Sequence, residues 1–303
     1  MENPPNHQEA ETRDRPRIAV VLGSGGIKAF AAIPLFEFLD QHQIDTDLLI
    51  GCSGGSLLCA GRAAGFGPTK MRDLTKLWGR KFTSQVDYRS MLGIAHPKLR
   101  QIGRAPAILR PDRIRELFDE LFQDRRLEDL PTKTRLQATD LQTGEPVILG
   151  TGRIADSVYA SSSCFPLLPP IRIGGRWLID GAFSSPLPVM EAVKRGMDLI
   201  IALDFTQQIT AEPKGFLDFF NLSFNATARS LTGSQMALSI GLHHYEIVMI
   251  NVHFDKVINL WDAKETSAIL EAGQKAIEER RGDILSAIEN FSKVERKGPD
   301  EFS

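Results

Sequence analysis

Residues 47–55, Asp-Leu-Leu-Ile-Gly-Cys-Ser-Gly-Gly, decide the fold of this 303-residue chain. The apolar run is typical of a buried strand, and it leads into a G-x-S-x-G pattern centred on Ser53. The small residues that follow predict a helix. A serine at such a strand-to-helix turn is lifted out of the sheet, and the free amides of the helix point toward it. We therefore predict that Ser53 is a nucleophile and that Gly51 and Gly55 let the chain turn, with a plain Gly/Ser-rich turn as the alternative.

Strand-like and helix-like runs alternate on both sides of this segment. Strands are expected at 17–23, 47–52, 135–141, 145–149, 176–179 and 198–205, and helices at 27–41, 54–65, 112–122, 186–195 and 265–281. The strands at 135–141 and 145–149 are joined at Thr143-Gly144, which is a hairpin signal. This alternation predicts an α/β fold with a mostly parallel central sheet and helices on both faces.

Composition narrows the domain organisation and the classes of partner. With 36 basic and 38 acidic residues the formal net charge is −2, which argues against a protein built to bind nucleic acid. The three cysteines have neither disulfide-framework nor zinc spacing, so we expect no structural metal. We expect a disordered arm at 1–16, one domain at 17–292 and a polar tail at 293–303. Neither a cleavable signal peptide nor an 18-residue apolar span is visible, which predicts a cytoplasmic protein, with secretion by a route that uses no cleavable signal as the alternative.

A glycine loop, Gly23-Ser24-Gly25-Gly26-Ile27-Lys28, follows the first predicted strand and opens a helix. As a phosphate loop it lacks the G-K-[ST] ending and the third glycine of the dinucleotide fingerprint. As an oxyanion hole it would offer the backbone amides of Gly25 and Gly26 to the charge of a tetrahedral intermediate. Beside Ser53 the second interpretation is favoured, because parallel strands bring such loops to one edge of the sheet.

A serine nucleophile needs a general base. The six histidines (His7, His42, His96, His243, His244 and His253) do not lie in glycine-marked loops after strands, although a sequence-remote histidine stays an alternative. Asp180 is the favoured base, because Asp180-Gly181-Ala182 follows a predicted strand and places the carboxylate at its end. An aspartate becomes a better base when it is partly desolvated. The alternative is an ordinary Asp-Gly turn residue.

These three motifs, in this order, resemble those of the patatin-like phospholipases. The resemblance extends to Leu130-Pro131, to the stretch 138–145 and to Ala160-Ser161-Ser162 with its following prolines, and covers roughly residues 17–281. It implies a three-layer α/β/α hydrolase with a catalytic dyad of Ser53 and Asp180. The loop Gly23, Ser24, Gly25 and Gly26 would form the oxyanion hole, and no metal or other cofactor is implied. Lys28 takes the place of the family's Arg or Lys and is otherwise expected to be exposed or ion-paired, while Ala29 stands where many members have glycine.

The resemblance implies a serine acyl hydrolase that cleaves phospholipids or lysophospholipids through an acyl-enzyme. A general carboxylesterase or thioesterase and a catalytically silent lipid-binding module are alternatives. Such an enzyme would contact membranes or micelles peripherally, bind no nucleic acid, and could form a homodimer. A nucleotide-binding protein is disfavoured, because the glycine loop lacks the phosphate-site residues.

Two segments are candidates for contact with lipid. Residues 70–104 hold nine basic residues against two acidic ones, a net charge of +7, which suits anionic head groups or merely a solvated surface. Residues 215–224, Gly-Phe-Leu-Asp-Phe-Phe-Asn-Leu-Ser-Phe, form the most aromatic stretch. Core packing of a helix is the favoured interpretation there, with an interfacial anchor, a lid or a dimer contact as alternatives.

Overall fold

The computed structural model describes residues 15–83, 107–205, 207, 212–243, 246–258 and 262–296. An eight-stranded sheet runs through this part of the chain in the order β5-β6-β3-β2-β1-β7-β8, with β4 also paired to β3. The strands are β1 (Ile18–Leu22), β2 (Leu48–Cys52), β3 (Lys133–Asp140), β4 (Pro146–Leu149), β5 (Ile171–Ile173), β6 (Arg176–Asp180), β7 (Leu199–Asp204) and β8 (Glu246–Asn251).

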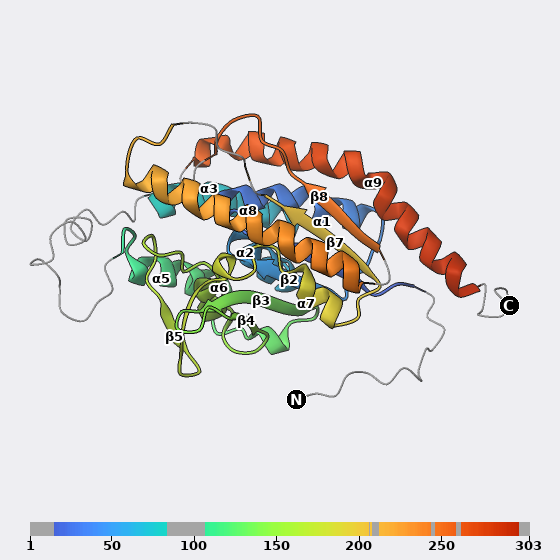
Figure 1. Ribbon diagram of the computed structural model, residues 1–303, viewed down its shortest axis with the longest axis horizontal. Coiled ribbons are helices and arrows are strands. Elements are labelled where there is room, and N and C mark those ends of the chain that lie inside the picture. Colours follow the sequence, from blue (N-terminus) through green and yellow to red (C-terminus); the bar gives the residue numbers. More distant parts are fainter. Residues whose placement is uncertain are drawn as a thin grey trace, which may run out of the picture.

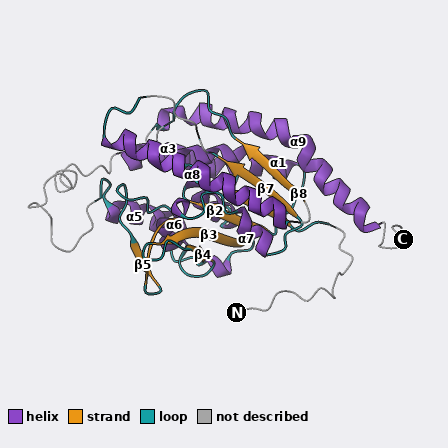
Figure 2. Ribbon diagram, viewed as in Figure 1, coloured by secondary structure: helices purple, strands orange, loops and turns teal. Residues whose placement is uncertain are grey.

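The helices flank this sheet (Figures 1 and 2). The α-helices are α1 (Ile33–Gln41), α2 (Gly54–Ala63), α3 (Pro68–Thr83), α5 (Pro111–Phe122), α6 (Ile154–Ser161), α7 (Val189–Lys194), α8 (Phe216–Leu242) and α9 (Thr266–Arg296). Four short 3-10 helices, η1 (Gly26–Ala32), η3 (Leu127–Asp129), η4 (Gly181–Phe183) and η5 (Ala263–Glu265), join them. No helix in the described ranges is long and apolar enough to cross a membrane.

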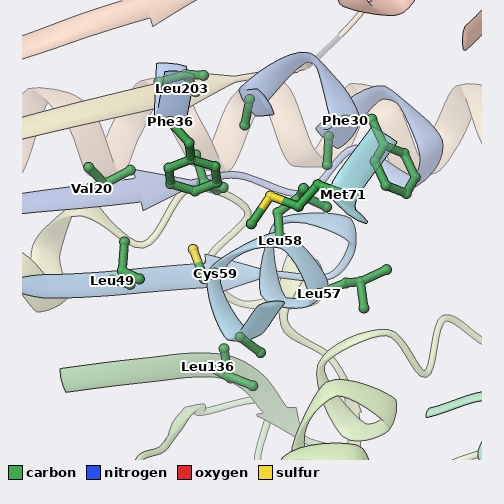
Figure 3. Packing of buried hydrophobic residues seen from close by; sticks show 14 of the residues in the cluster. Val20, Phe30, Phe36, Leu49, Leu57, Leu58, Cys59, Met71, Leu136 and Leu203 are labelled. Atoms are coloured by element: carbon green, nitrogen blue, oxygen red, sulfur yellow. The ribbon is translucent and has the colours of Figure 1, made fainter. Parts of the chain in front are cut away.

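The two faces of the sheet are covered by different helices, because side chains alternate along each strand. Val20, Leu49 and Leu203 point to one face and pack against α1, α2 and α9, and Figure 3 shows part of this cluster around Leu58. The opposite face, which includes Val21, packs chiefly against α7. The fold is therefore the three-layer α/β/α arrangement with a mostly parallel sheet that the sequence predicts.

The parallel part of the sheet explains where the site lies. β3, β2, β1, β7 and β8 run in the same direction, so their carboxyl ends meet at one edge. β6 runs antiparallel to β3 and β5 antiparallel to β6, so these two strands form a hairpin at the end of the sheet. The loops after β1 and β2 therefore open at this edge of the sheet, and β6 lies beside them through its pairing with the carboxyl half of β3.

Several local predictions need correction. The helix expected from residue 27 begins as the 3-10 turn η1 and becomes α-helical only at Ile33. β5 and β8 were not predicted. Arg15, placed in the predicted arm, forms an ion pair with Asp47, and α9 continues to Arg296. The boundaries of the arm, the domain and the tail stay predictions.

Candidate active site

Ser53 lies at the sharp turn between β2 and α2. Its backbone has φ 52° and ψ −121°, a conformation that residues with a side chain rarely adopt. The two flanking glycines are required by close packing of the turn. A Cβ on Gly51 would lie 2.6 Å from the carbonyl oxygen of Gly55, and one on Gly55 would lie 2.5 Å from that of Leu22. The G-x-S-x-G pattern thus specifies a tight elbow that presents Ser53 at the sheet edge.

The side chain of Ser53 is hydrogen-bonded to Asp180, 127 residues further along the chain. The hydroxyl Oγ donates to Asp180 Oδ2 at 2.7 Å, and Asp180 Oδ1 accepts the amide of Ala182 at 2.9 Å. The carboxyl group is 1% exposed, and this burial raises the pKa of Asp180 to about 7, against the two hydrogen bonds, which lower it. A carboxylate with this pKa is a far better proton acceptor at neutral pH than an ordinary aspartate.

Strand register brings these two groups together. Cys52 of β2 pairs with Gln137 of β3, and Ala138 of β3 pairs with Asp180 of the antiparallel β6. The turn after Asp180 packs so closely on β3 that a Cβ on Gly181 would lie 2.3 Å from the carbonyl oxygen of Gln137. Thr139 Oγ1 also donates to the backbone oxygen of Asp180 at 2.9 Å. β3 is therefore the common support of both side chains.

Ser161, at the end of α6, is a site residue that sequence reasoning missed. Its Oγ accepts the backbone amide of Ser53 at 2.9 Å and donates to the carbonyl oxygen of Gln137 at 2.6 Å. The side chain is fully buried. It therefore ties the strained backbone of the elbow to β3, which also carries Asp180. The only signal in the sequence was its place in the Ala160-Ser161-Ser162 segment of the family resemblance.

The glycine loop packs directly on the elbow. A Cβ on Gly54 would lie 2.2 Å from the carbonyl oxygen of Gly26, and one on Gly25 would lie 2.7 Å from Cβ of Phe205. The amide of Gly23 donates to Leu203 at 3.0 Å and that of Ser24 to Pro186 at 2.8 Å. Two of the four predicted loop residues thus already have backbone acceptors, which narrows the oxyanion-hole prediction to the amides of Gly25 and Gly26.

Lys28 differs from the expectation of an exposed or ion-paired residue. Its side chain is 8% exposed and lines the same cavity as Ser53, with Nζ 5.9 Å from the ring centroid of Phe254. Burial lowers the pKa of Lys28 to about 8, partly opposed by the charge of Asp204. No carboxylate of the described residues lies within ion-pair distance of Nζ. Among the described residues, the buried ammonium group of Lys28 thus faces the site with only the charge of Asp204 in partial compensation.

A cavity of about 130 Å³ joins these groups. Its polar floor contains Ser53, Asp180 and the loop glycines, and its walls are mainly apolar. The walls are formed by Leu109, Leu167, Leu168, Phe205, Phe220, Phe224, Ala228 and Ile258. Such a space accepts an apolar chain at one side and presents a serine hydroxyl to its polar end.

Other predicted groups do not reach the cavity or lie outside the described residues. Of the histidines, the three whose side chains the structure describes (His42, His243 and His253) do not line it. Cys52 is buried, and Cys164 lies in the cavity wall. Within the described ranges no three metal-ligating side chains gather in a possible metal site.

The two candidate lipid segments have different outcomes. In residues 70–104, Lys70 lies 3.5 Å from the ring centroid of Phe66 and Arg72 forms an ion pair with Glu37. Residues 84–104 lie outside the described residues, so the lipid-contact hypothesis for this segment stays a prediction. In residues 215–224, the core-packing interpretation is wrong, because Phe219 is 59% exposed and Phe220 and Phe224 are half-buried in the cavity wall.

The three-layer fold and the strand-end serine bonded to a buried aspartate define an α/β protein with a serine elbow site. A family model described as patatin-like phospholipase matches residues 20–193, which is more than half of the chain. The chain belongs to the patatin-like phospholipase family, as its motifs predict.

The individual relatives of this chain share less than a third of its residues over the aligned parts. An uncharacterized NTE family protein of Mycobacterium tuberculosis is 27% identical over 218 residues, covering 70% of this chain and 57% of that protein. Lysophospholipase NTE1 of Yarrowia lipolytica is 28% identical over 191 residues, covering 62% of this chain and 12% of the yeast protein. Among solved structures, VipD from Legionella pneumophila aligns over 87% of this chain and 67% of that chain, with 14% identity and a TM-score of 0.46. The chain thus spans little more than half the length of the mycobacterial relative and a small part of the yeast one.

Proposed function

We propose that this protein hydrolyses fatty acyl esters of phospholipids or lysophospholipids, with Ser53 as nucleophile and Asp180 as general base. One observation carries the proposal: the hydroxyl of the elbow serine donates at 2.7 Å to a buried carboxylate whose pKa is about 7. Family membership and the name lysophospholipase of the yeast relatives support a lipid ester as the substrate.

The reaction follows from these positions. Asp180 takes the hydroxyl proton as Ser53 Oγ attacks the ester carbonyl carbon, and the carbonyl oxygen becomes an oxyanion facing the amides of Gly25 and Gly26. The intermediate collapses, the alcohol of the substrate leaves with the proton from Asp180, and the acyl group stays on Ser53. Water then attacks the acyl-enzyme, Asp180 takes its proton, and the fatty acid is released as Ser53 recovers its own.

Lys28 supports an anionic lipid over a neutral ester. Its buried ammonium group lines the cavity beside the dyad, and the charge of Asp204 offsets its burial only in part, so a substrate phosphate would supply a further counter-charge. The apolar wall with Phe220 and Phe224 would hold the acyl chain. A general carboxylesterase would need neither the charge nor a long apolar wall.

The test is analysis of the products formed from a lysophosphatidylcholine, a phosphatidylglycerol and a short-chain neutral ester. We expect fatty acid from the phospholipids, lost in Ser53→Ala and in Asp180→Asn with the fold intact by circular dichroism. Ser157→Ala is the matched control. Ser157 is also buried, but its hydroxyl donates to the carbonyl oxygen of Arg153, the residue just before α6, and not to a site residue. Binding of lipid without any product would identify a catalytically silent lipid-binding module instead.

A further inference from the structure

We propose that the hairpin formed by β5 and β6 is the surface through which this protein contacts an anionic lipid bilayer. The inference rests on the proposed function, since it supplies a route to a lipid substrate. We define the hairpin surface as Leu141, Arg172 and Trp177, which share one face of the strands, together with Arg176, which lies next to Trp177 in β6 and points to the opposite face. None of these residues belongs to the catalytic motifs, and none was singled out from the sequence as a lipid contact.

The hairpin surface combines large apolar side chains with basic ones. Trp177 is 44% exposed and Leu141 is 49% exposed, and the amide of Leu141 donates to the carbonyl oxygen of Trp177 at 2.8 Å. Arg172 stands directly opposite Trp177 in the antiparallel ladder, so their side chains share one face of the hairpin. A tryptophan, which is apolar but carries an N–H donor, is the side chain most typical of the boundary between lipid and water.

The two arginines give the hairpin positive charge, Arg172 on the face of Trp177 and Arg176 on the opposite face. Arg172 Nε donates to the carbonyl oxygen of Gly175 at 3.3 Å, which leaves most of its guanidinium donors to solvent. Neither Arg172 nor Arg176 forms an ion pair with a carboxylate of the described residues. The complementary partner is therefore a negatively charged surface, and the neighbouring Trp177 and Leu141 favour one with an apolar interior.

The strand register places this surface toward the same edge of the sheet as the catalytic groups, although Trp177 and Asp180, three residues apart in β6, point to opposite faces. Asp180 is level with Ala138, and Trp177 and Leu141 each lie three residues further toward the carboxyl end of β3. Three strand residues span about 10 Å, so the hairpin surface extends beyond the dyad at the edge where the cavity lies. Figure 1 shows β5 at the periphery of the molecule, away from the central strand β2. The chain also runs directly from the cavity-lining Leu167 and Leu168 into β5.

Exposed apolar side chains elsewhere offer a matched comparison. Ile240 is 61% exposed, more than Trp177, but it lies in the last turn of α8. The residues of α8 that line the cavity, from Phe220 to Ala228, belong to the first half of the helix. If exposure of apolar area alone determined lipid contact, Ile240 would matter at least as much as Trp177.

The test is co-sedimentation with vesicles of phosphatidylcholine alone or mixed with phosphatidylglycerol, in a Ser53→Ala background so that no lipid is hydrolysed. We expect binding only to the mixed vesicles, weakened roughly tenfold or more by the double variant Arg172→Ala/Arg176→Ala and by Trp177→Ala, but unchanged by Ile240→Ser. Quenching of tryptophan fluorescence by brominated lipid should be lost in Trp177→Phe. With Ser53 present, Trp177→Ala should hydrolyse a soluble short-chain ester as well as the parent.

Two results would overturn the proposal: full vesicle binding by the Trp177 and arginine variants, or an equal loss in Ile240→Ser. Failure of the proposed function is separate from this, because it would appear as absent ester hydrolysis in the parent protein while the vesicle assay still reports which surface binds.

Discussion

Ser161 acts on the site through the backbone of Ser53 and does not touch the reacting atoms itself. In Ser161→Ala the buried amide of Ser53 loses its acceptor, which costs about 1–3 kcal/mol and loosens the strained elbow. We expect kcat for a short-chain ester to fall roughly ten- to hundredfold while KM stays unchanged. Steady-state kinetics on the purified variant measures both constants.

Ser163→Ala separates positioning from general destabilisation. Ser163 is equally buried, and its Oγ donates to the carbonyl oxygen of Tyr159 at 2.8 Å, but no hydrogen bond links its side chain to Ser53. Its loss should lower the melting temperature about as much as Ser161→Ala and leave kcat unchanged. An equal fall in kcat for both variants would mean that Ser161 only stabilises the fold.

Lys28 and Asp180 together predict a pH profile that depends on the substrate. Asp180 is an effective base only when ionised, so kcat/KM should rise through pH about 7. The pKa of Lys28 is about 8, so its charge disappears above that pH and kcat/KM for an anionic lysophospholipid should fall again. A neutral short-chain ester should show the rise alone. In Lys28→Met, kcat/KM for the anionic lysophospholipid should no longer fall at alkaline pH. If it still falls in this variant, another group causes the decrease.

At the scale of elements, contact between the elbow and the glycine loop should be intolerant of a single methyl group. Gly54→Ala would place a Cβ 2.2 Å from the carbonyl oxygen of Gly26, and either α2 or the loop must shift. We expect a loss of about 1–3 kcal/mol in the free energy of unfolding and a large fall in kcat, since the amides of Gly25 and Gly26 would move. Urea denaturation and ester kinetics measure the two effects.

Gly233→Ala is the matched control for this substitution. Gly233 is a helical glycine of α8 with nothing within 4 Å of an added Cβ. Alanine there should stabilise the protein by up to about 1 kcal/mol, because it favours the helix, and should leave kcat unchanged. If Gly54→Ala behaved like Gly233→Ala, the loop and the elbow would not be coupled.

Elements with a local signature could be predicted from the sequence, and those defined by distant partners could not. The elbow, the glycine loop and the Asp-Gly turn each have a short residue motif next to a strand, so the sequence indicates them even though their glycines also contact distant segments. β5 has only three residues, too few to show a period. β8 begins shortly after a long helix, and periodicity alone does not distinguish its short apolar run from more of that helix. Ser161, at the end of α6, is hydrogen-bonded to Ser53 across 108 residues, because both lie beside β3, and no local pattern in the sequence indicates this contact.

At the scale of the whole molecule, burial of Asp180 should lower stability as the pH rises. Its pKa is about 7 in the folded protein and near 4 when unfolded, so the unfolded state releases its proton first. The stabilising contribution is complete below pH 4 and is lost between pH 4 and 7. Asp180→Asn should therefore raise the free energy of unfolding by up to about 4 kcal/mol at pH 8 but by only about 1.4 kcal/mol at pH 5, and urea denaturation at the two pH values measures this. An equal gain at both pH values would contradict the buried, raised-pKa carboxylate.

The most direct test of the whole account is covalent labelling of the intact protein with a fluorophosphonate, followed by peptide mass spectrometry. We expect one label, on Ser53, and a labelling rate that falls by orders of magnitude in Asp180→Asn. In the parent protein the rate should rise as the pH passes through about 7. A label on another residue, or equal rates in the parent and Asp180→Asn, would contradict the serine–aspartate site.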